Sequence, residues 1–509
     1  MALGRMPVLP YVSAMGETQS ATVDARETHI SRLFFTPDRV HKLLKPIETG
    51  FLDHRSSAAR AEAVQRELDL NRRLAPDVYL GVSGLEENGE IVDTMLTMRR
   101  LPDEARLSNL VDTPELDRAL RSVARTIATF HASLEPETAP TTMGDAAGLL
   151  SLWTSSFAEM RPDAGTVLDA ADFARAESLV HDYLEHADDL FAHRRAAGLI
   201  RDGHGDLIAE DIFILPDGPR ILDCLAFSRD LRVCDVLADI AFLVMDIHRL
   251  AGVEAAQRLM TWYREFSGEH HPGSLAHHYV AYRAHIRAKV ELIRHRQGIA
   301  EAAERARMYH QLTLEHLTRA RLRLVLVGGG PGTGKTTLAH EIGQRTGWLV
   351  LGSDEERKDL AGLGHETHVD DAPGKGLYDP ATTAHTYRQL LQHADVGLAA
   401  GESVVLDASW ADIGNRVLAA DLAERHGAEL IELRCHVSIA EAKRRVTRRR
   451  QSGRDASDAR PEIVDFLGAR FDDWPSATVI DTSGPLDAAG THAVTIAWRQ
   501  CTARTVRRR

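Results

Sequence analysis

The first 320 residues alternate between short apolar runs and helical patterns. Runs prone to form strands lie at Val40 to Lys42 and at Thr94 to Met98, where turn or charged residues bound them. Helical patterns occupy residues 61–74 and 123–134, and in the second the apolar residues recur at spacings of three and four. Such patterns dominate to about residue 200 and resume from about 235 to 320, after a hairpin-like segment at 211–224. This order predicts an α+β region whose second part is largely helical.

The pattern changes at residues 323–327, where the continuous apolar run RLVLV precedes a glycine-rich turn and another helical pattern. A buried strand that leads into a helix in this way opens a parallel α/β unit. We therefore place a domain boundary near Ala320 and expect the segment 298–320 before it to be a helical linker. The predicted organisation is a tail at 1–24, an α+β domain at 25–320 and an α/β domain at 321–509.

Length and charge narrow the class of protein. A chain of 509 residues exceeds what one hydrophobic core normally organises, which agrees with two domains. Hydrophobic residues make up 44% and charged residues 27%, as in soluble globular proteins. The formal net charge of −13 argues against nucleic acid as a partner, because such binding depends on neutralising phosphates.

The cysteines and the amino terminus indicate where the protein resides. Cys224, Cys234, Cys435 and Cys501 show neither metal-ligand spacing nor the density of a disulfide scaffold, so we interpret them as structural residues in a reducing compartment. The first 20 residues lack the apolar core of a secretory signal. No stretch approaches about 18 uninterrupted apolar residues. We expect a cytoplasmic protein without a membrane partner.

The glycine-rich turn at 329–336, GGPGTGKT, satisfies the pattern G-x-x-x-x-G-K-[ST] between a strand and a helix. In that context the backbone N–H groups surround nucleotide phosphates, Lys335 reaches the β and γ phosphates, and the Thr336 hydroxyl ligates Mg²⁺. A glycine-rich turn without a nucleotide is the alternative. The predicted ATP-binding residues here are Gly329, Gly330, Gly332, Thr333, Gly334, Lys335, Thr336 and Thr337.

Two carboxylates follow predicted strands of the same domain, where open α/β sheets bind ligands. Asp407 ends the strand in GESVVLDASW and is the candidate to hold magnesium. Asp354 is the candidate to accept the proton of a substrate hydroxyl, with Arg357 as a substrate anchor. For Asp354 the alternative is structural, because Ser353 and Glu356 have the spacing of a capping box and an acid favours a first helical turn.

A basic helix with a second capping-box spacing is predicted from Ser438 onwards. Arg444 and Arg448 lie four residues apart on one face and could steady a transferring phosphoryl group as lid arginines. Alternatively, these arginines only interact with the helix dipole and solvent.

These motifs resemble the P-loop small-molecule kinases of the gluconate kinase and zeta toxin type, over about residues 321 to 475. The resemblance rests on GGPGTGKT, SDEERK, VVLDAS and the lid-like segment RRVTRRR…DASDA, of which only the first is highly specific. The resemblance implies that the second substrate is a small hydroxylated molecule.

The segment GHGDLIAEDIFIL, residues 203–215, has the histidine, glycine and aspartate of a phosphotransferase loop. Kinase chemistry of the protein-kinase type needs one carboxylate to orient the acceptor hydroxyl and two further oxygen ligands for magnesium. Asp206 is the candidate for the first task, and Asp211 and Asp223 are candidates for the second. With His204 they resemble the loop of aminoglycoside phosphotransferase-like kinases, H-G-D-x-x-x-x-N, except that Asp211 replaces the asparagine.

The same resemblance implies roles for residues elsewhere in the domain. Lys42 would leave a strand to hold the α and β phosphates, with Lys45 as the second choice. Glu67, on the apolar face of its helix, would pair with that lysine, since an unpaired carboxylate there is costly. Alternatively, Glu67 only borders the core. Asp239 matches a structural aspartate of that fold.

Nearly the whole chain from about residue 25 resembles a bacterial two-domain family, in which an aminoglycoside phosphotransferase-like, protein-kinase-like α+β domain precedes an α/β P-loop domain with a parallel sheet. The sequence predicts an enzyme that uses ATP and Mg²⁺ to phosphorylate a hydroxyl of a sugar-like small molecule, with one or two active sites. The rival hypothesis is a nucleotide-dependent regulatory or binding protein, because a degenerate site would also explain Asp211. The acceptor and the oligomeric state are left open.

Overall fold

The chain divides into two structural units, each built from two stretches of the sequence. The computed structural model describes residues 24–28, 30–49, 52–87, 90–365, 367, 376–452 and 471–498. Unit 1 consists of Met1–Gly144 and Ala197–His270, and unit 2 of Asp145–Ala196 and His271–Arg509. Helices on both sides of Ala320 thus belong to unit 2. The domain limits predicted from the sequence, 25–320 and 321–509, differ from the limits of these units and stay a prediction.

Unit 1 begins with an antiparallel sheet of strand order β1-β2-β3-β7-β6. Its elements are β1 (Asp24–Glu27), β2 (Ser31–Phe35), β3 (Arg39–Leu44), β6 (Tyr79–Glu87) and β7 (Glu90–Arg99), with the short pair β4 (Glu48–Thr49) and β5 (Leu52–Asp53) and the helix α1 (Ser57–Asn71). Val64 and Leu68 of α1 pack with Leu44 and Leu96 of the sheet in one buried cluster. This packing fixes the face of α1 that also carries Glu67.

The second part of unit 1 is mainly helical, as the sequence predicts. Its elements are η1 (Asp103–Ala105), η2 (Leu107–Asn109), α2 (Leu116–Ser133), β8 (Ile200–Asp202), η4 (Ala209–Asp211), β9 (Ile212–Leu215), β10 (Gly218–Ile221), α6 (Arg229–Arg232), β11 (Val233–Asp235), α7 (Val236–Ala251) and α8 (Val253–Ser267). The predicted hairpin is the antiparallel pair β9 and β10. Helix α7 is buried over most of its length and packs against α8.

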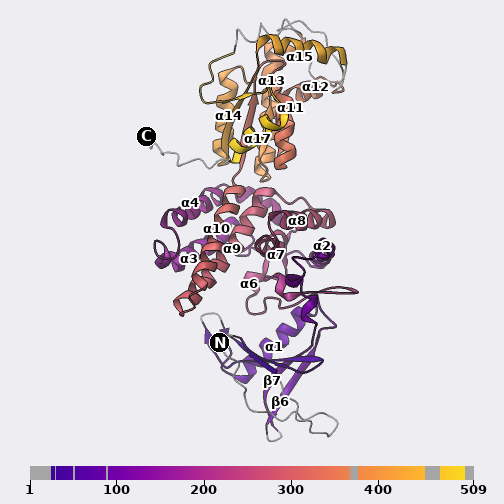
Figure 1. Ribbon diagram of the computed structural model, residues 1–509, viewed down its shortest axis with the longest axis vertical. Coiled ribbons are helices and arrows are strands. Elements are labelled where there is room, and N and C mark those ends of the chain that lie inside the picture. Colours follow the sequence, from indigo (N-terminus) through magenta and orange to yellow (C-terminus); the bar gives the residue numbers. More distant parts are fainter. Residues whose placement is uncertain are drawn as a thin grey trace. The chain divides into compact units, whose positions relative to one another are not determined.

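Unit 2 contains a group of helices in which α9 and α10 run side by side (Figure 1). The group consists of α3 (Ala146–Met160), η3 (Arg161–Asp163), α4 (Ala170–Leu184), α5 (Asp188–Ala196), α9 (Gly273–Arg296) and α10 (Ala302–Ala320). Helix α10 corresponds to the predicted linker helix and ends two residues before the first strand of the P-loop sheet. The Arg323 side chain of that strand donates to the Thr318 carbonyl of α10 at 2.9 Å and lies over the Trp498 ring.

The parallel sheet of unit 2 has the order β13-β14-β12-β15-β16, which confirms the predicted fold class. Its strands are β12 (Arg323–Gly328), β13 (Leu349–Gly352), β14 (Val404–Asp407), β15 (Glu429–His436) and β16 (Thr478–Asp481). The accompanying helices are α11 (Lys335–Thr346), α12 (Ser353–Leu360), η5 (Gly376–Tyr378), α13 (Pro380–Ala399), α14 (Ile413–Arg425), α15 (Ile439–Ser452) and α17 (Leu486–Trp498).

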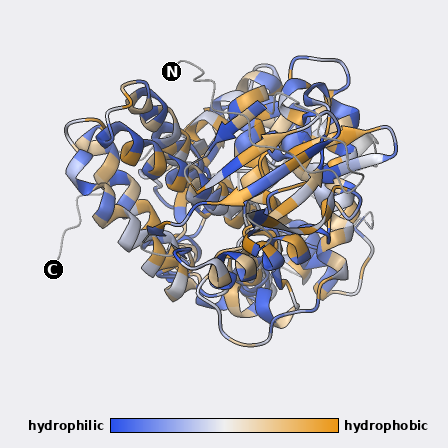
Figure 2. Cartoon of the chain, turned by 90° about the horizontal axis from the view of Figure 1, so that it is seen from below, coloured by the Kyte–Doolittle hydropathy of each residue, from blue (hydrophilic) through white to orange (hydrophobic). Residues whose placement is uncertain are grey.

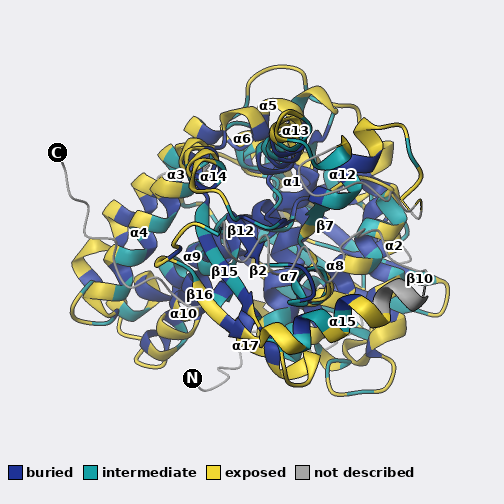
Figure 3. Cartoon of the chain, turned by 90° about the horizontal axis from the view of Figure 1, so that it is seen from above, coloured by how far each residue is buried: buried dark blue, intermediate teal, exposed yellow. Residues whose placement is uncertain are grey.

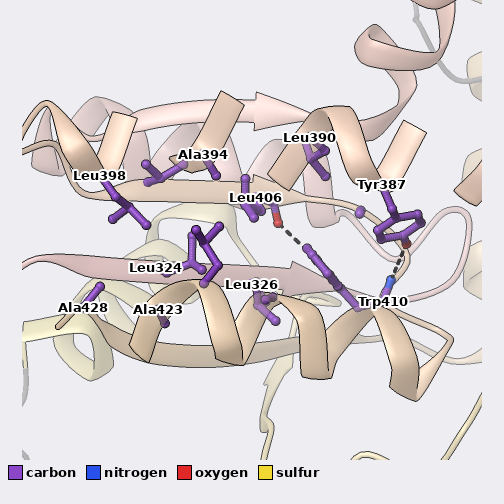
Figure 4. Packing of buried hydrophobic residues seen from close by; sticks show 14 of the residues in the cluster. Leu324, Leu326, Tyr387, Leu390, Ala394, Leu398, Leu406, Trp410, Ala423 and Ala428 are labelled. Carbon is purple, nitrogen blue, oxygen red and sulfur yellow. Dashed lines mark hydrogen bonds between the residues drawn. The ribbon is translucent and has the colours of Figure 1, made fainter. Parts of the chain in front are cut away.

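Alternate residues of the central strand β12 pack on opposite faces of this sheet, as strand geometry requires. Leu324 and Leu326 belong to a cluster with residues of α13 and α14, which Figure 4 shows. Val325 and Val327 belong to a second cluster with residues of α11 and α17. The sheet is therefore covered by helices on both sides, which leaves the ends of its strands as the place where a ligand could bind.

Surface and core are distributed as in ordinary globular domains. Most helices carry both hydrophobic and hydrophilic residues (Figure 2), and exposed residues gather on outer helices such as α4, α14 and α15 (Figure 3). No helix in the described ranges is both long and apolar enough to span a bilayer. Cys224, Cys234 and Cys435 are buried and form no disulfide, whereas Cys501 lies outside the described residues.

The helices of unit 2 enclose histidines that must stay neutral. The Trp153 indole donates to His278 Nε2 at 3.2 Å, and burial lowers the pKa of His278 to about 3. His285 lies 4.6 Å from Trp153, ring to ring, and neither of its ring nitrogens has a hydrogen-bond partner within the described part of the chain. Burial, together with the charges of His310 and Lys289, lowers the pKa of His285 well below its ordinary value.

We expect unit 2 to lose stability in mild acid. Below about pH 6.5 the unfolded chain takes up protons that the folded state refuses, so each such histidine costs about 1.4 kcal/mol per pH unit until its folded pKa is reached. For His278 and His285 together this is about 4 kcal/mol at pH 5. Urea titrations at pH 7 and pH 5 measure the loss. His285→Phe should reduce the difference by about half, whereas the exposed His181→Phe should leave it unchanged; an equal pH response in all three proteins would contradict this account.

Candidate active sites

A buried aspartate holds the GHGD loop of unit 1 in place. Asp239 of α7 accepts hydrogen bonds from the backbone N–H groups of His204 and Gly205, both at 2.7 Å. Its Oδ2 lies 3.0 Å from His131 Nε2 of α2. Burial alone would raise the pKa of Asp239, but His131 and the loop amides lower it well below its usual range. A Cβ on Gly203 would lie 2.4 Å from Asp239 Oδ2, so this position requires glycine.

His204 connects the loop to the end of the β9–β10 hairpin. Its Nε2 lies 3.1 Å from the Leu222 carbonyl, and the Leu225 N–H donates to the His204 carbonyl at 2.9 Å. Burial lowers the pKa of His204 to about 4, so the ring is neutral at pH 7. His204 thus positions the backbone between the loop and Asp223.

Asp223 occupies a conformation that is rare for an aspartate. Its φ is +62°, in the left-handed region, where non-glycine residues mostly occur under structural constraint. Its N–H donates to the Tyr79 hydroxyl at 3.1 Å, and the next N–H, of Cys224, donates to Asn71 Oδ1 at 2.8 Å. These two hydrogen bonds, to Tyr79 of the sheet and Asn71 of α1, hold the turn in its strained conformation. They thereby fix the direction of the Asp223 carboxylate.

The predicted lysine and carboxylate of unit 1 are in contact. Lys42 Nζ on β3 lies 2.7 Å from Glu67 Oε1 and 3.5 Å from Asp223 Oδ1. Burial opposes the charge of Lys42, but the two carboxylates raise its pKa above the ordinary value. Lys45, the second choice, instead donates to the Thr28 carbonyl at 2.5 Å. The geometry therefore favours Lys42.

Negative charges converge at Asp211. Burial and the charges of Asp223 and Asp206 raise the pKa of Asp211 well above its usual range. A bound cation would stabilise the charged form of these neighbouring carboxylates. No three potential ligands already form a metal site in the described ranges. Mg²⁺ generally takes one or two carboxylates and shares the rest of its shell with phosphates and water.

The P-loop of unit 2 depends on glycine at several points. Gly329, Gly332 and Gly334 have φ values of +138°, +79° and +85°. A Cβ on Gly332 would lie 2.5 Å from the Ala442 carbonyl of α15. Inside the turn, the Thr333 hydroxyl donates to the Gly330 carbonyl at 2.8 Å. The turn ends at α11, whose first residue is Lys335, so free N–H groups of a helix start face this turn.

Asp407 ends β14 beside the P-loop. Burial raises its pKa, while Lys335 and a hydrogen bond with Thr336 act against that rise. Its buried Oδ1 has no hydrogen-bond partner among the described residues. A buried carboxylate oxygen left unpaired next to a P-loop threonine fits a cation held there.

Asp354 and Arg357 form a pair on the first turn of α12. Arg357 Nη1 donates to Asp354 Oδ1 at 2.6 Å, and its guanidinium lies 4.7 Å from the centre of the Tyr378 ring. The charge of Asp354 also acts on Asp407. The capping-box alternative for Ser353 is wrong, because Gly352 is the N-cap residue and the Glu356 side chain instead contacts His393 of α13 at 2.6 Å.

The basic helix α15 presents a different arginine to the P-loop than the two predicted from the sequence. Arg444 is 71% exposed and pairs with Glu441, and Arg448 is also exposed. Arg445 donates to the Thr482 carbonyl at 2.9 Å, and the Thr482 hydroxyl donates to the Thr333 carbonyl at 2.5 Å. Sequence reasoning missed Arg445 and Thr482. The residues 453–470, with the DASDA part of the lid-like segment, lie outside the described residues.

Comparisons with known proteins match two successive parts of the chain. The family model described as Phosphotransferase enzyme family matches residues 39–275, and the model described as AAA domain matches residues 324–473. The Mycobacterium tuberculosis protein called Uncharacterized protein Rv2004c is 36% identical over 484 residues, which is 95% of this chain and 96% of that protein. The Mycobacterium bovis protein Mb2027c matches equally well.

Solved structures of lower sequence identity also match portions of the chain. The GDP and kanamycin complex of APH(2")-IIia is 16% identical and covers 57% of this chain and 92% of its own, with a TM-score of 0.39. A sugar kinase from Janibacter sp. HTCC2649 is 22% identical and covers 35% of this chain and 94% of its own, with a TM-score of 0.27.

Proposed function

This chain belongs to the same two-domain family as its mycobacterial relatives, with a phosphotransferase-family domain ahead of a P-loop domain, and on that basis we propose that it is an ATP- and Mg²⁺-dependent small-molecule kinase. The acceptor is a hydroxyl of a sugar or sugar-like metabolite. Both units carry a nucleotide site. We place the protein in the cytoplasm.

The buried, unpaired Oδ1 of Asp407 beside Thr336 is the observation that carries this proposal. An unpaired buried carboxylate oxygen is costly, and it persists where a function needs it. Asp407 and Thr336 would hold the magnesium ion, which when bound would neutralise charge on the nucleotide phosphates. The residues that surround the phosphates are Gly329, Gly330, Gly332, Thr333, Gly334, Lys335, Thr336 and Thr337.

The acceptor side of the P-loop site is formed by α12. Asp354 accepts the proton of the acceptor hydroxyl, and its contact with Arg357 orients its carboxylate. Arg357 donates to acceptor oxygens from a position braced by Tyr378. Arg444 and Arg448, exposed on α15, are the candidates to steady the transferring phosphoryl group.

In unit 1, Lys42 holds the nucleotide phosphates and Glu67 fixes the lysine, as their 2.7 Å contact supports. Asp211 and Asp223 hold the metal ion, and Asp206 orients the acceptor hydroxyl. A bound cation relieves the repulsion among Asp206, Asp211 and Asp223. Nucleotide binding and metal binding at this site are therefore linked.

The proposal is tested by incubating the full chain with ATP, Mg²⁺ and a pooled metabolite extract and by identifying new phosphorylated compounds by mass. Transfer to a defined metabolite separates the kinase from the rival, a regulatory protein with an inactive unit 1. ATP hydrolysis without an acceptor would not separate them. If no compound gains a phosphoryl group while ATP still binds, the regulatory hypothesis stands.

We expect Asp211→Asn to keep or raise the transfer activity of unit 1. The change keeps an oxygen ligand and removes one of the charges that repel Asp206 and Asp223. The activity is measured in a Lys335→Ala background, which silences the P-loop site. Asp223→Ala should abolish Mg²⁺-dependent nucleotide binding by unit 1 in the same background. If neither change affects that binding, unit 1 is a pseudokinase.

A further inference from the structure

The residues that follow Asp407 form a turn under backbone strain. Trp410 has a φ of +52°, which is unusual for a bulky side chain. Its ring is fully buried, and its indole N–H donates to the Leu406 carbonyl at 3.2 Å. Strain of this kind persists only where neighbouring contacts hold it, and it gathers at functional sites.

Tyr387 of α13 supplies the contact that closes this turn (Figure 4). Its hydroxyl accepts a hydrogen bond from the Trp410 backbone N–H at 3.1 Å and lies 3.0 Å from Ser409 Oγ. The two rings meet edge to face, with centres 5.2 Å apart. Tyr387 is itself buried, and burial raises the pKa of its hydroxyl, so it stays protonated. The hydroxyl can accept from Trp410 and donate to Ser409 at once.

The same turn is bonded directly to the P-loop. The Ser409 carbonyl accepts from the Gly329 N–H at 3.1 Å, and the Ala408 N–H donates to the Val327 carbonyl at 3.3 Å. The turn that follows Asp407 is therefore hydrogen-bonded to the first glycine of the P-loop. A shift of this turn would move the carboxylate and the phosphate cradle together.

Other contacts of the turn cannot replace the tyrosine hydroxyl. Arg416 Nη1 donates to the Trp410 carbonyl at 3.1 Å, and the indole bond fixes the ring. Neither satisfies the Trp410 N–H, which would be buried and unpaired without Tyr387. Such a group drives local rearrangement. The backbone would then relax toward an unstrained φ and turn Asp407 away.

We infer that Tyr387 is a positioning residue, which holds the strained turn 408–410 so that Asp407 stays aligned with Thr336 for the metal ion of the P-loop site. This inference rests on the proposed function of that site. The rings of Tyr387 and Trp410 pack in the core cluster, but the Tyr387 hydroxyl is bonded to the turn that directly follows Asp407 at the end of its strand. We therefore assign the hydroxyl to metal-dependent binding.

The test compares full-length Tyr387→Phe with Tyr183→Phe, which loses a similar buried hydroxyl contact, to Ser274 Oγ at 3.1 Å, among the helices of unit 2. ATP binding is titrated by calorimetry with Mg²⁺ and with EDTA. The component that Lys335→Ala removes reports the P-loop site. In Tyr387→Phe the gain in affinity that Mg²⁺ brings should fall about tenfold, the size of one hydrogen bond in free energy. Tyr183→Phe should bind as wild type.

Each result bears on a separate claim. If wild type shows no component sensitive to Lys335→Ala, the proposed function fails, whatever Tyr387→Phe does. If that component exists and Tyr387→Phe keeps the full Mg²⁺ effect, the inference is wrong. An equal loss of affinity with Mg²⁺ and with EDTA, or loss of the folded state in Tyr387→Phe alone, would assign the hydroxyl to packing and would overturn the inference as well.

Discussion

Lys335→Ala should lower the ATP affinity of the P-loop site by about 100-fold while the protein stays folded. Charge-assisted hydrogen bonds to phosphate contribute about 1.5–3 kcal/mol, and this lysine begins α11, where its charge already acts on Asp407. Its side chain supports no core cluster, so the fold should survive. Calorimetric titration of the full chain with ATP and Mg²⁺ measures the loss.

Lys289→Ala is the matched control for this experiment. Lys289 lies on α9 in the same unit, where it makes a loose ion pair with Glu159 at 3.4 Å. Its removal should leave every ATP-binding component unchanged. ATP affinity that stays the same in Lys335→Ala would show that the turn 329–336 does not hold nucleotide phosphates.

Asp206→Ala should reduce phosphoryl transfer by unit 1 about 10²–10⁴-fold, the range of a general-base contribution, with little effect on ATP affinity. The two units each bring their own lysine and carboxylates, so the activities should be separable. Transfer to the metabolite that the screen identifies is measured in Asp206→Ala, Lys335→Ala and the double variant. Each single variant should abolish a different part of the total.

Asp217→Ala is the control for Asp206→Ala, because it tests whether removing another aspartate of this region also lowers phosphoryl transfer. Asp217 is exposed and pairs with Arg220, away from the GHGD loop along the chain. It should transfer at the wild-type rate. If Lys335→Ala removes all transfer and Asp206→Ala removes none, unit 1 is a binding or regulatory module and the protein has one active site.

The local parts of both sites could be predicted from the sequence. The P-loop spacing from Gly329 to Thr336 specifies a strand, a turn and a helix start, and the structure has each of them. The strand that ends in Asp407 and the hairpin before Asp223 are equally local. Short-range patterns are reliable here because the turn geometry depends on the residues within it.

The parts that depend on packing could not be predicted. The spacing of Ser353 and Glu356 suggests a capping box, but Glu356 finds His393 on another helix, 37 residues along the chain. Arg444 and Arg445 are adjacent, and only the rotation of α15 against the P-loop decides which one faces it. Tyr387 carries no motif, since its role comes from where α13 lies against β14.

Unit 2 is discontinuous in sequence, and this has a consequence for its synthesis. Leu149, Trp153 and Phe157 of α3 are buried, and Trp153 and Phe157 pack on His285 of α9. On a ribosome, α3 emerges more than a hundred residues before α9 is complete. At about 5–20 residues per second, its apolar face waits roughly 10 s in the nascent chain. A ribosome stalled near residue 270 would leave that face without its α9 partner for as long as the stall lasts.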